Sequence, residues 1–272
     1  MLPALCLLNA VCAARSLHTF GYDWLVRSSG GTKSGPGPNV FSDSRASAYV
    51  GDDGALHLAQ HRSTAAGALR TDFDCAEVTL GSALGYGMYD FSSDRALDAL
   101  GRADPHVVLG LFLYKDDAHE LDIEFARWGA GASASKLNAD YVNQPNTGAS
   151  KALLWTQPAG LGATTHRIDF QPGLVQWSSF STADGPTKPY VHFVSTDKVP
   201  AADGMLVHVN LWCVALAARC FAAPPAPAPR ANHTPAPAHT HPPRVRRMFR
   251  GASNLTQDTL DVSISNFTFT AH

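Results

Sequence analysis

The chain has 272 residues, of which 45% are hydrophobic and 16% are charged, and its formal net charge is −2. This length and composition are sufficient for one large hydrophobic core. The near-neutral charge gives no global attraction to nucleic acid or to an anionic membrane, so we expect neither as a partner.

The first 14 residues form an apolar run that ends in small residues before Arg15. We expect residues 1–14 to be a signal peptide, although the usual basic start is missing. The alternatives are a misassigned start or a buried N-terminal strand. The run is too short to insert across a bilayer. We therefore expect a secreted, extracellular protein of the cell wall or matrix.

Glycosylation sequons and cysteines also bear on whether the protein is secreted. Asn232, Asn254 and Asn266 each begin an Asn-X-Thr sequon, which supports export and predicts a glycoprotein. Loss of the signal peptide would leave three cysteines, Cys75, Cys213 and Cys220. The simplest expectation is one disulfide and one free thiol. Cys213 and Cys220 are the local candidate pair, but the sequence leaves the pairing open.

After a stretch rich in Gly, Pro and Ser over residues 18–50, short alternating apolar runs follow one another with turn signals between them. Only residues 94–100 and 215–220 allow brief helical turns. This pattern predicts an all-β fold, a two-sheet sandwich or jelly roll. The predicted strands cover residues 56–58, 75–80, 86–91, 107–114, 120–125, 139–144, 166–170, 174–177, 190–194, 206–212 and 261–269.

A proline-rich segment over residues 221–243 interrupts this series. Such a composition cannot build a core and predicts an extended loop. The chain then returns through a strongly alternating run over residues 261–269, which predicts one final strand. We therefore interpret residues 15–272 as a single domain that carries a loop insertion.

The sharpest chemical feature is a row of acids in the strand predicted over residues 120–125. Glu120, Asp122 and Glu124 alternate with apolar residues, so their side chains leave one face of the strand. Adjacent like charges destabilise a sheet, and a merely solvated face would intersperse other polar residues. Crowded carboxyls have raised proton affinities, which a general acid requires. Because positions i and i+4 lie about 13 Å apart on a straight strand, cooperation of the two glutamates requires a curved sheet.

The motif Glu-Leu-Asp-Ile-Glu resembles the Glu-x-Asp-x-Glu signature of glycoside hydrolase family 16, the laminarinase, lichenase and xyloglucan-transglycosylase group. Weaker likenesses to the same family occur in order at residues 35–41, 84–89, 165–177 and 209–212. The resemblance implies a concave, concanavalin A-like jelly roll. It also implies a retaining endo-hydrolase of β-linked polysaccharide, with β-1,3- or mixed-linkage glucan as the commonest substrate of the family.

On the matching positions, the resemblance makes Glu120 the nucleophile and Glu124 the acid/base. Asp122 would lie between them and tune both through a proton or hydrogen bond. A retaining mechanism needs such a pair of carboxyls about 5–5.5 Å apart. His166 also matches a family histidine, and we interpret it as structural.

Sugar-binding residues are expected around these acids, because pyranose rings stack their C–H faces on aromatic side chains. Asn210 and Trp212 share one strand face and match a pair that lines the family's cleft. Trp128 would share the face of Glu124 if that strand continues so far, and Trp155 and Tyr114 are weaker candidates; core packing is the alternative for each aromatic. We expect Asn39 and Gln144 to donate hydrogen bonds to sugar hydroxyls; the alternative for Asn39 is that it serves only its turn.

Two other functions use the same fold. A transglycosylase would employ the same residues, and a non-catalytic, lectin-like matrix protein would only bind polysaccharide. Three crowded acids give a binding-only site no advantage, which favours the enzyme. We expect no cofactor and no metal in the cleft; a structural calcium away from it is neither indicated nor excluded. We expect the enzyme to act as a monomer on its polysaccharide.

Overall fold

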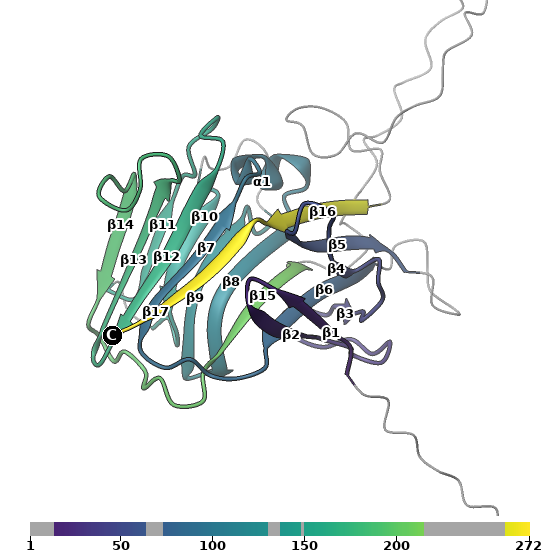
Figure 1. The fold of residues 1–272 in the computed structure, drawn as a ribbon, viewed down its shortest axis with the longest axis horizontal. Helices are drawn as coiled ribbons and strands as arrows, with labels where there is room; N and C mark the ends of the chain where they lie inside the picture. Colours follow the sequence, from purple (N-terminus) through teal and green to yellow (C-terminus); the bar gives the residue numbers. More distant parts are fainter. Residues whose placement is uncertain (1–13, 64–72, 130–136, 148–149, 215–258) are drawn as a thin grey trace, which may run out of the picture.

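The computed structural model describes residues 14–63, 73–129, 137–147, 150–214 and 259–272. These residues form two stacked β-sheets, and Figure 1 shows the long strands β8 and β9 curving along their length. The larger sheet comprises β1 (Ser16–Thr19), β2 (Tyr22–Val26), β3 (Val40–Phe41), β4 (Ala48–Val50), β5 (Leu56–Arg62), β6 (Phe73–Leu80), β8 (Val107–Asp116), β9 (His119–Ala126), β10 (Ala139–Asn143), β11 (Ala152–Trp155), β15 (Leu206–Cys213) and β16 (Thr259–Ile264).

The smaller sheet has the strand order β14-β13-β12-β7-β17. Its members are β7 (Gly87–Ser93), β12 (Thr164–Gln171), β13 (Leu174–Ser181), β14 (Val191–Ser195) and β17 (Asn266–Ala271). In the larger sheet the central order is β1-β2-β6-β15-β8-β9-β10-β11. The helical residues within the described ranges are a 3₁₀ turn, Leu97–Ala99, and the helix α1, Leu100–Ala103.

The core lies between the two sheets and follows from strand alternation. On β9, the side chains of Leu121, Ile123 and Phe125 are fully buried in this core. Trp177 and Phe170 face them from the smaller sheet and are equally buried. Because successive side chains of a strand point to opposite faces, the acids between these residues must leave the outer face of the larger sheet.

These features confirm the predicted all-β jelly-roll sandwich, and the predicted strands recur with small shifts of their ends. The single final strand predicted over residues 261–269 is wrong. The chain bends at Ser265, so that β16 pairs with β5 of the larger sheet and β17 pairs with β7 of the smaller one. Alternation alone does not reveal the change of sheet, since both halves keep the same period.

A buried polar chain ties the two sheets together directly behind the acid strand. The His166 ring hydrogen-bonds with the hydroxyls of Ser179 at 2.7 Å and Thr164 at 2.9 Å, and Ser179 also contacts the Tyr141 hydroxyl at 2.5 Å. Complete burial lowers the pKa of His166 to about 3. This neutral, satisfied histidine confirms the structural interpretation of its position.

The described cysteines are in different states. Cys75 is a buried free thiol, and burial raises its pKa to about 12. Cys213 is disulfide-bonded, and its partner lies outside the described residues, as does Cys220. The predicted signal peptide, except its last residue, and the proline-rich segment also lie outside them. None of the helices in the described ranges has the length and apolar character needed to cross a membrane.

Candidate active site

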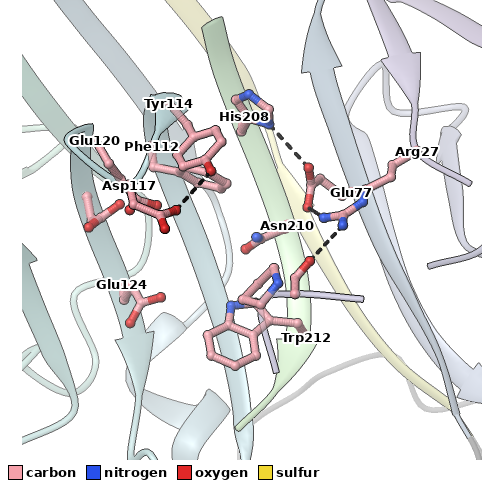
Figure 2. Close-up of a pocket in the computed structure, with 13 residues that line it drawn as sticks. Arg27, Glu77, Phe112, Tyr114, Asp117, Glu120, Glu124, His208, Asn210 and Trp212 are labelled. Carbon is pink, nitrogen blue, oxygen red and sulfur yellow. Dashed lines mark hydrogen bonds and ion pairs between the residues drawn. The ribbon is translucent and has the colours of Figure 1, made fainter. Parts of the chain in front are cut away.

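The outer face of the larger sheet is hollowed into a cleft of about 450 Å³ above β9, β8, β15 and β6. Figure 2 shows Glu120 and Glu124 on one side of this cleft, with Asn210 and Trp212 between them and a second charged cluster. All three predicted acids line the cleft, and Asp122 is the most deeply buried of them, with 7% of its surface exposed. The structure thus brings the predicted catalytic residues together over the curved strands.

The three acids hold their protons unusually strongly. The pKa of Glu120 is raised to about 7, first by burial and then by the nearby charges of Glu124 and Asp117, while a hydrogen bond with Asp122 opposes the rise. Burial, followed by the charges of the two glutamates, raises the pKa of Asp122 well above its ordinary value. The raised pKa favours the protonated form of Asp122, and the hydrogen bond between Asp122 and Glu120 favours the ionised form of Glu120.

Glu124 is fixed by a residue beyond its own strand. Its pKa is raised by burial, and the indole of Trp128, whose Nε1 donates to its Oε2 at 2.9 Å, partly opposes that rise. The prediction that Trp128 shares a strand face with Glu124 required the strand to continue to Trp128. This prediction is wrong, because β9 ends at Ala126. Trp128 instead reaches Glu124 through a turn, in which its φ is 44°. This left-handed backbone is rare outside glycine and marks a constrained position.

The floor of the cleft depends on a missing side chain. Gly110 of β8 lies between Glu124 and Asn210 in register across three neighbouring strands. A Cβ added to Gly110 would stand 2.5 Å from Oδ1 of Asn210, so only glycine admits the amide there. Asn210 is 2% exposed, and its Oδ1 is buried without a hydrogen-bond partner in the described part of the chain. The floor of the cleft thus holds an amide oxygen that the described part of the protein leaves without a hydrogen bond.

Aromatic rings border this floor. Phe112, Tyr114 and Trp212 line the cleft, as expected for Trp212 and for the weaker candidate Tyr114. The Tyr114 hydroxyl donates to Asp117 at 3.2 Å, and the Phe112 ring stacks on His208 with ring centroids 4.9 Å apart. The aromatic rings and the buried amide together give the cleft the mixed apolar and polar surface that a sugar chain requires.

The opposite wall of the cleft carries a charged network that the sequence analysis missed. Glu77 of β6 accepts a hydrogen bond from Arg27 at 2.7 Å and interacts with Nδ1 of His208 at 3.2 Å. Burial pushes the pKa of Glu77 upward, but the hydrogen bonds and charges of His208 and Arg27 outweigh it, and the pKa is lowered. Arg27 also donates to Ser34 Oγ and to the Gly35 carbonyl, so it anchors the loop that forms this wall. The sequence signal that could have revealed this network is Glu77, an acid among the apolar residues of a predicted strand.

A second missed acid, Asp140 of β10, stands opposite Glu124 in the strand register. Burial and then the charge of Glu124 raise the pKa of Asp140 to about 8. The sequence around it alternates like many strands, and its neighbour on β9 could not be known without the register. Within the described ranges, no group of three or more His, Cys, Asp or Glu side chains could hold a metal ion.

Two of the predicted sugar-binding residues are wrong. Trp155 is only 6% exposed, because it pairs with the core residue Ala139 and packs against Phe125 and Tyr141 inside the sandwich. Asn39 is 4% exposed, and its amide donates to the carbonyls of Pro36 and Cys213. It therefore serves the turn, which was the alternative interpretation of this residue.

Gln144 contacts the acid strand but is not among the residues that line the cleft. It follows β10, where its backbone N–H donates to the Glu120 carbonyl at 3.0 Å. Its side chain hydrogen-bonds with Asp122, and its Oε1 accepts from the Asn146 backbone at 2.9 Å. Gln144 thus supports the middle acid, and its role toward a sugar hydroxyl stays a prediction.

Comparison with known proteins places the fold in a well-defined class. A β-glucanase of Bacillus licheniformis is 18% identical to this chain with a TM-score of 0.50, and the match covers 70% of this chain and 78% of that one. A prokaryotic β-1,3-1,4-glucanase (lichenase) derived from a mouse hindgut metagenome is 16% identical with a TM-score of 0.50, covering 70% and 79% respectively. No protein-family model and no curated protein sequence matches the chain. The chain is therefore similar in fold to these glucanases, in agreement with the fold that its sequence motifs imply.

Proposed function

We propose that the protein is a retaining endo-glycoside hydrolase of the family 16 type that acts on β-linked polysaccharide, with β-1,3- or mixed-linkage glucan as the expected substrate. The observation that carries this proposal is the acid row of β9 at the side of an open, partly aromatic cleft. The fold shared with a β-glucanase and a lichenase supports the same substrate class. A non-catalytic lectin would have no use for three buried carboxyls with raised pKa values.

In the first step, the Glu120 carboxylate attacks the anomeric carbon while Glu124 gives its proton to the departing glycosidic oxygen. Asp122 keeps its own proton and donates a hydrogen bond to Glu120, which helps that group to ionise despite its burial. In the second step, Glu124 removes a proton from water, and the hydroxide oxygen displaces Glu120 from the sugar. A sugar hydroxyl in place of water would give transglycosylation with the same groups.

Azide rescue tests the two roles separately. In Glu120→Gly, azide should occupy the space of the missing nucleophile and yield a glycosyl azide of inverted configuration from an activated aryl β-glucoside. In Glu124→Ala, azide should instead intercept the glycosyl-enzyme and yield a β-glycosyl azide. The same product from both variants, or no rescue of either, would contradict the assignment.

The expected localisation, oligomeric state and cofactor requirement of the protein are also proposals. We propose a secreted, monomeric protein without a cofactor. Of the three sequons, Asn266 lies at an exposed position at the start of β17, which is compatible with glycosylation there. Measuring the mass of the exported protein before and after N-glycan removal tests both export and glycosylation.

A further inference from the structure

We propose that Asp140 is a positioning residue of the acid/base site, which holds a proton jointly with Glu124 across the β9–β10 strand pair. This inference rests on the glycosidase function proposed above. Asp140 is the direct cross-strand partner of Glu124. Its chain neighbours Ala139 and Tyr141 are fully buried in the core, so Asp140 must leave the opposite face, which is the face of the cleft acids. Such partners have Cβ atoms about 4.5–5.5 Å apart.

The other surroundings of Asp140 offer its carboxyl little compensation. Its partner on β11 is Leu154, which carries no charge. The next residue on the same face of β10, Val142, stands opposite Asp122. Oδ1 of Asp140 is buried and has no hydrogen-bond partner among the residues that the structure describes. Burial and then the charge of Glu124 favour the protonated form of Asp140 and raise its pKa, and a hydrogen bond with the Glu124 backbone opposes this rise only in part.

The groups around the pair do not replace this interaction. On β8, the register neighbour of Glu124 is Gly110, which has no side chain to offer. Glu77 is already engaged by Arg27 and His208. The titratable and polar groups that line the cleft beside the pair or contact Glu124 are Asp122 and Glu120 on β9, Asp117 in the turn before β9, Tyr114 on β8, Asn210 and His208 on β15, Glu77 on β6, and Arg27 and Trp128 in loops.

Chemically, two neighbouring carboxyls in a low-dielectric site cannot both ionise easily, so the pair keeps its last proton to a higher pH than Glu124 alone would. The Trp128 N–H occupies Oε2 of Glu124, which leaves Oε1 to exchange the proton. While Glu124 holds this last proton, the ionised Asp140 raises the proton affinity of Glu124, so that Glu124 stays protonated until the leaving oxygen takes its proton. Asp140 thereby serves both the acid and the base form of Glu124 without touching the sugar.

The test titrates Glu124 directly and needs no substrate. Protein labelled with ¹³C at the glutamate carboxyl carbon is titrated by NMR, and the Glu124 signal is assigned by its loss in Glu124→Gln. In Asp140→Asn, which keeps the shape but cannot ionise, we expect the Glu124 titration to move to lower pH by about one unit or more, from two unit charges near 5 Å at an effective dielectric constant of about 20. Asp140→Glu should retain the coupling.

Asp117→Asn is the matched control, because it removes an acid from the same cleft but one that acts on Glu120 and not on Glu124. An unchanged Glu124 titration in Asp140→Asn, or an equal shift in Asp117→Asn, would overturn the proposal. If the enzyme is active, the basic limb of its pH profile should move to lower pH in Asp140→Asn as well. Absence of hydrolysis in the wild type would refute the proposed function while the titration still decides the pairing.

Discussion

Replacing Arg27 with methionine should destabilise the fold at neutral pH, because it leaves the buried Glu77 carboxylate without its cationic partner. Glu77 is 4% exposed, and Arg27 contacts it at 2.7 Å while also donating to Ser34 and Gly35. Breaking a buried ion pair costs about 3–5 kcal/mol, and a charged hydrogen bond contributes about 1.5–3 kcal/mol. Since the Arg27 side chain is 29% exposed and His208 still contacts Glu77, we expect a loss of about 2 kcal/mol.

The pH dependence of this loss follows from the lowered pKa of Glu77. A carboxyl with a lowered folded-state pKa contributes its stabilisation above its unfolded pKa and loses it as the pH falls through the folded value. The deficit of Arg27→Met should therefore be largest near pH 7 and should shrink below about pH 4, where the carboxyl takes up a proton. Urea unfolding followed by tryptophan fluorescence measures the free energies of unfolding of the wild type and of Arg27→Met at each pH.

The double variant Arg27→Met with Glu77→Gln supplies the control. Removing the charge of Glu77 should recover about 1 kcal/mol relative to Arg27→Met alone, because no buried carboxylate is left unpaired. A deficit below about 0.5 kcal/mol, or one that is the same near pH 3 as at pH 7, would refute the reasoning.

Three further predictions concern other parts of the molecule. Trp128→Phe removes the N–H that favours ionised Glu124, so the Glu124 titration should move to higher pH, as read by carboxyl NMR; a shift to lower pH would contradict it. The pKa of His57 is raised, first by its hydrogen bond with Asp261. The stabilisation that this histidine contributes is therefore complete below its unfolded pKa of about 6.5 and is lost as the pH rises through the folded value. The melting temperature of the wild type should accordingly fall between about pH 6 and pH 9, and His57→Gln should abolish this fall. Trp212→Ala should weaken binding of a β-glucan oligosaccharide about ten-fold in calorimetry, or about 1.4 kcal/mol, with little change in melting temperature, and unchanged affinity would remove it from the sugar site.

Much of the fold was predictable because burial dictates a simple alternation. Apolar residues at every second position predict the strands around Ile123 and Trp177, and both side chains are fully buried. The acid row was predictable for the same reason, since three acids between core positions must share a face. The change of sheet at Ser265 was not, because it depends on which strand each half pairs with.

The rest of the site depends on strand register, which the sequence does not contain. Asp140 becomes relevant only because β10 places it opposite Glu124. Trp155 was misassigned because an aromatic side chain gives the same sequence signal in a cleft and in a core, and the pairing with Ala139 decides between them. Alternation therefore predicts which face a residue occupies relative to its chain neighbours, and the tertiary structure decides what lies beside it.

The most direct test of the central claim is the release of reducing ends from a panel of β-glucans, galactans and xyloglucan, with the products identified, by the wild type and by Glu120→Gln. Each protein is also tested for binding to the same polymers, and circular dichroism establishes that the variant is folded. The account predicts that the wild type releases oligosaccharides from a β-1,3- or mixed-linkage glucan and that Glu120→Gln still binds that polymer but releases none. Binding of a polymer by both proteins without release of reducing ends or any transfer product from either would contradict the account and favour a lectin-like protein.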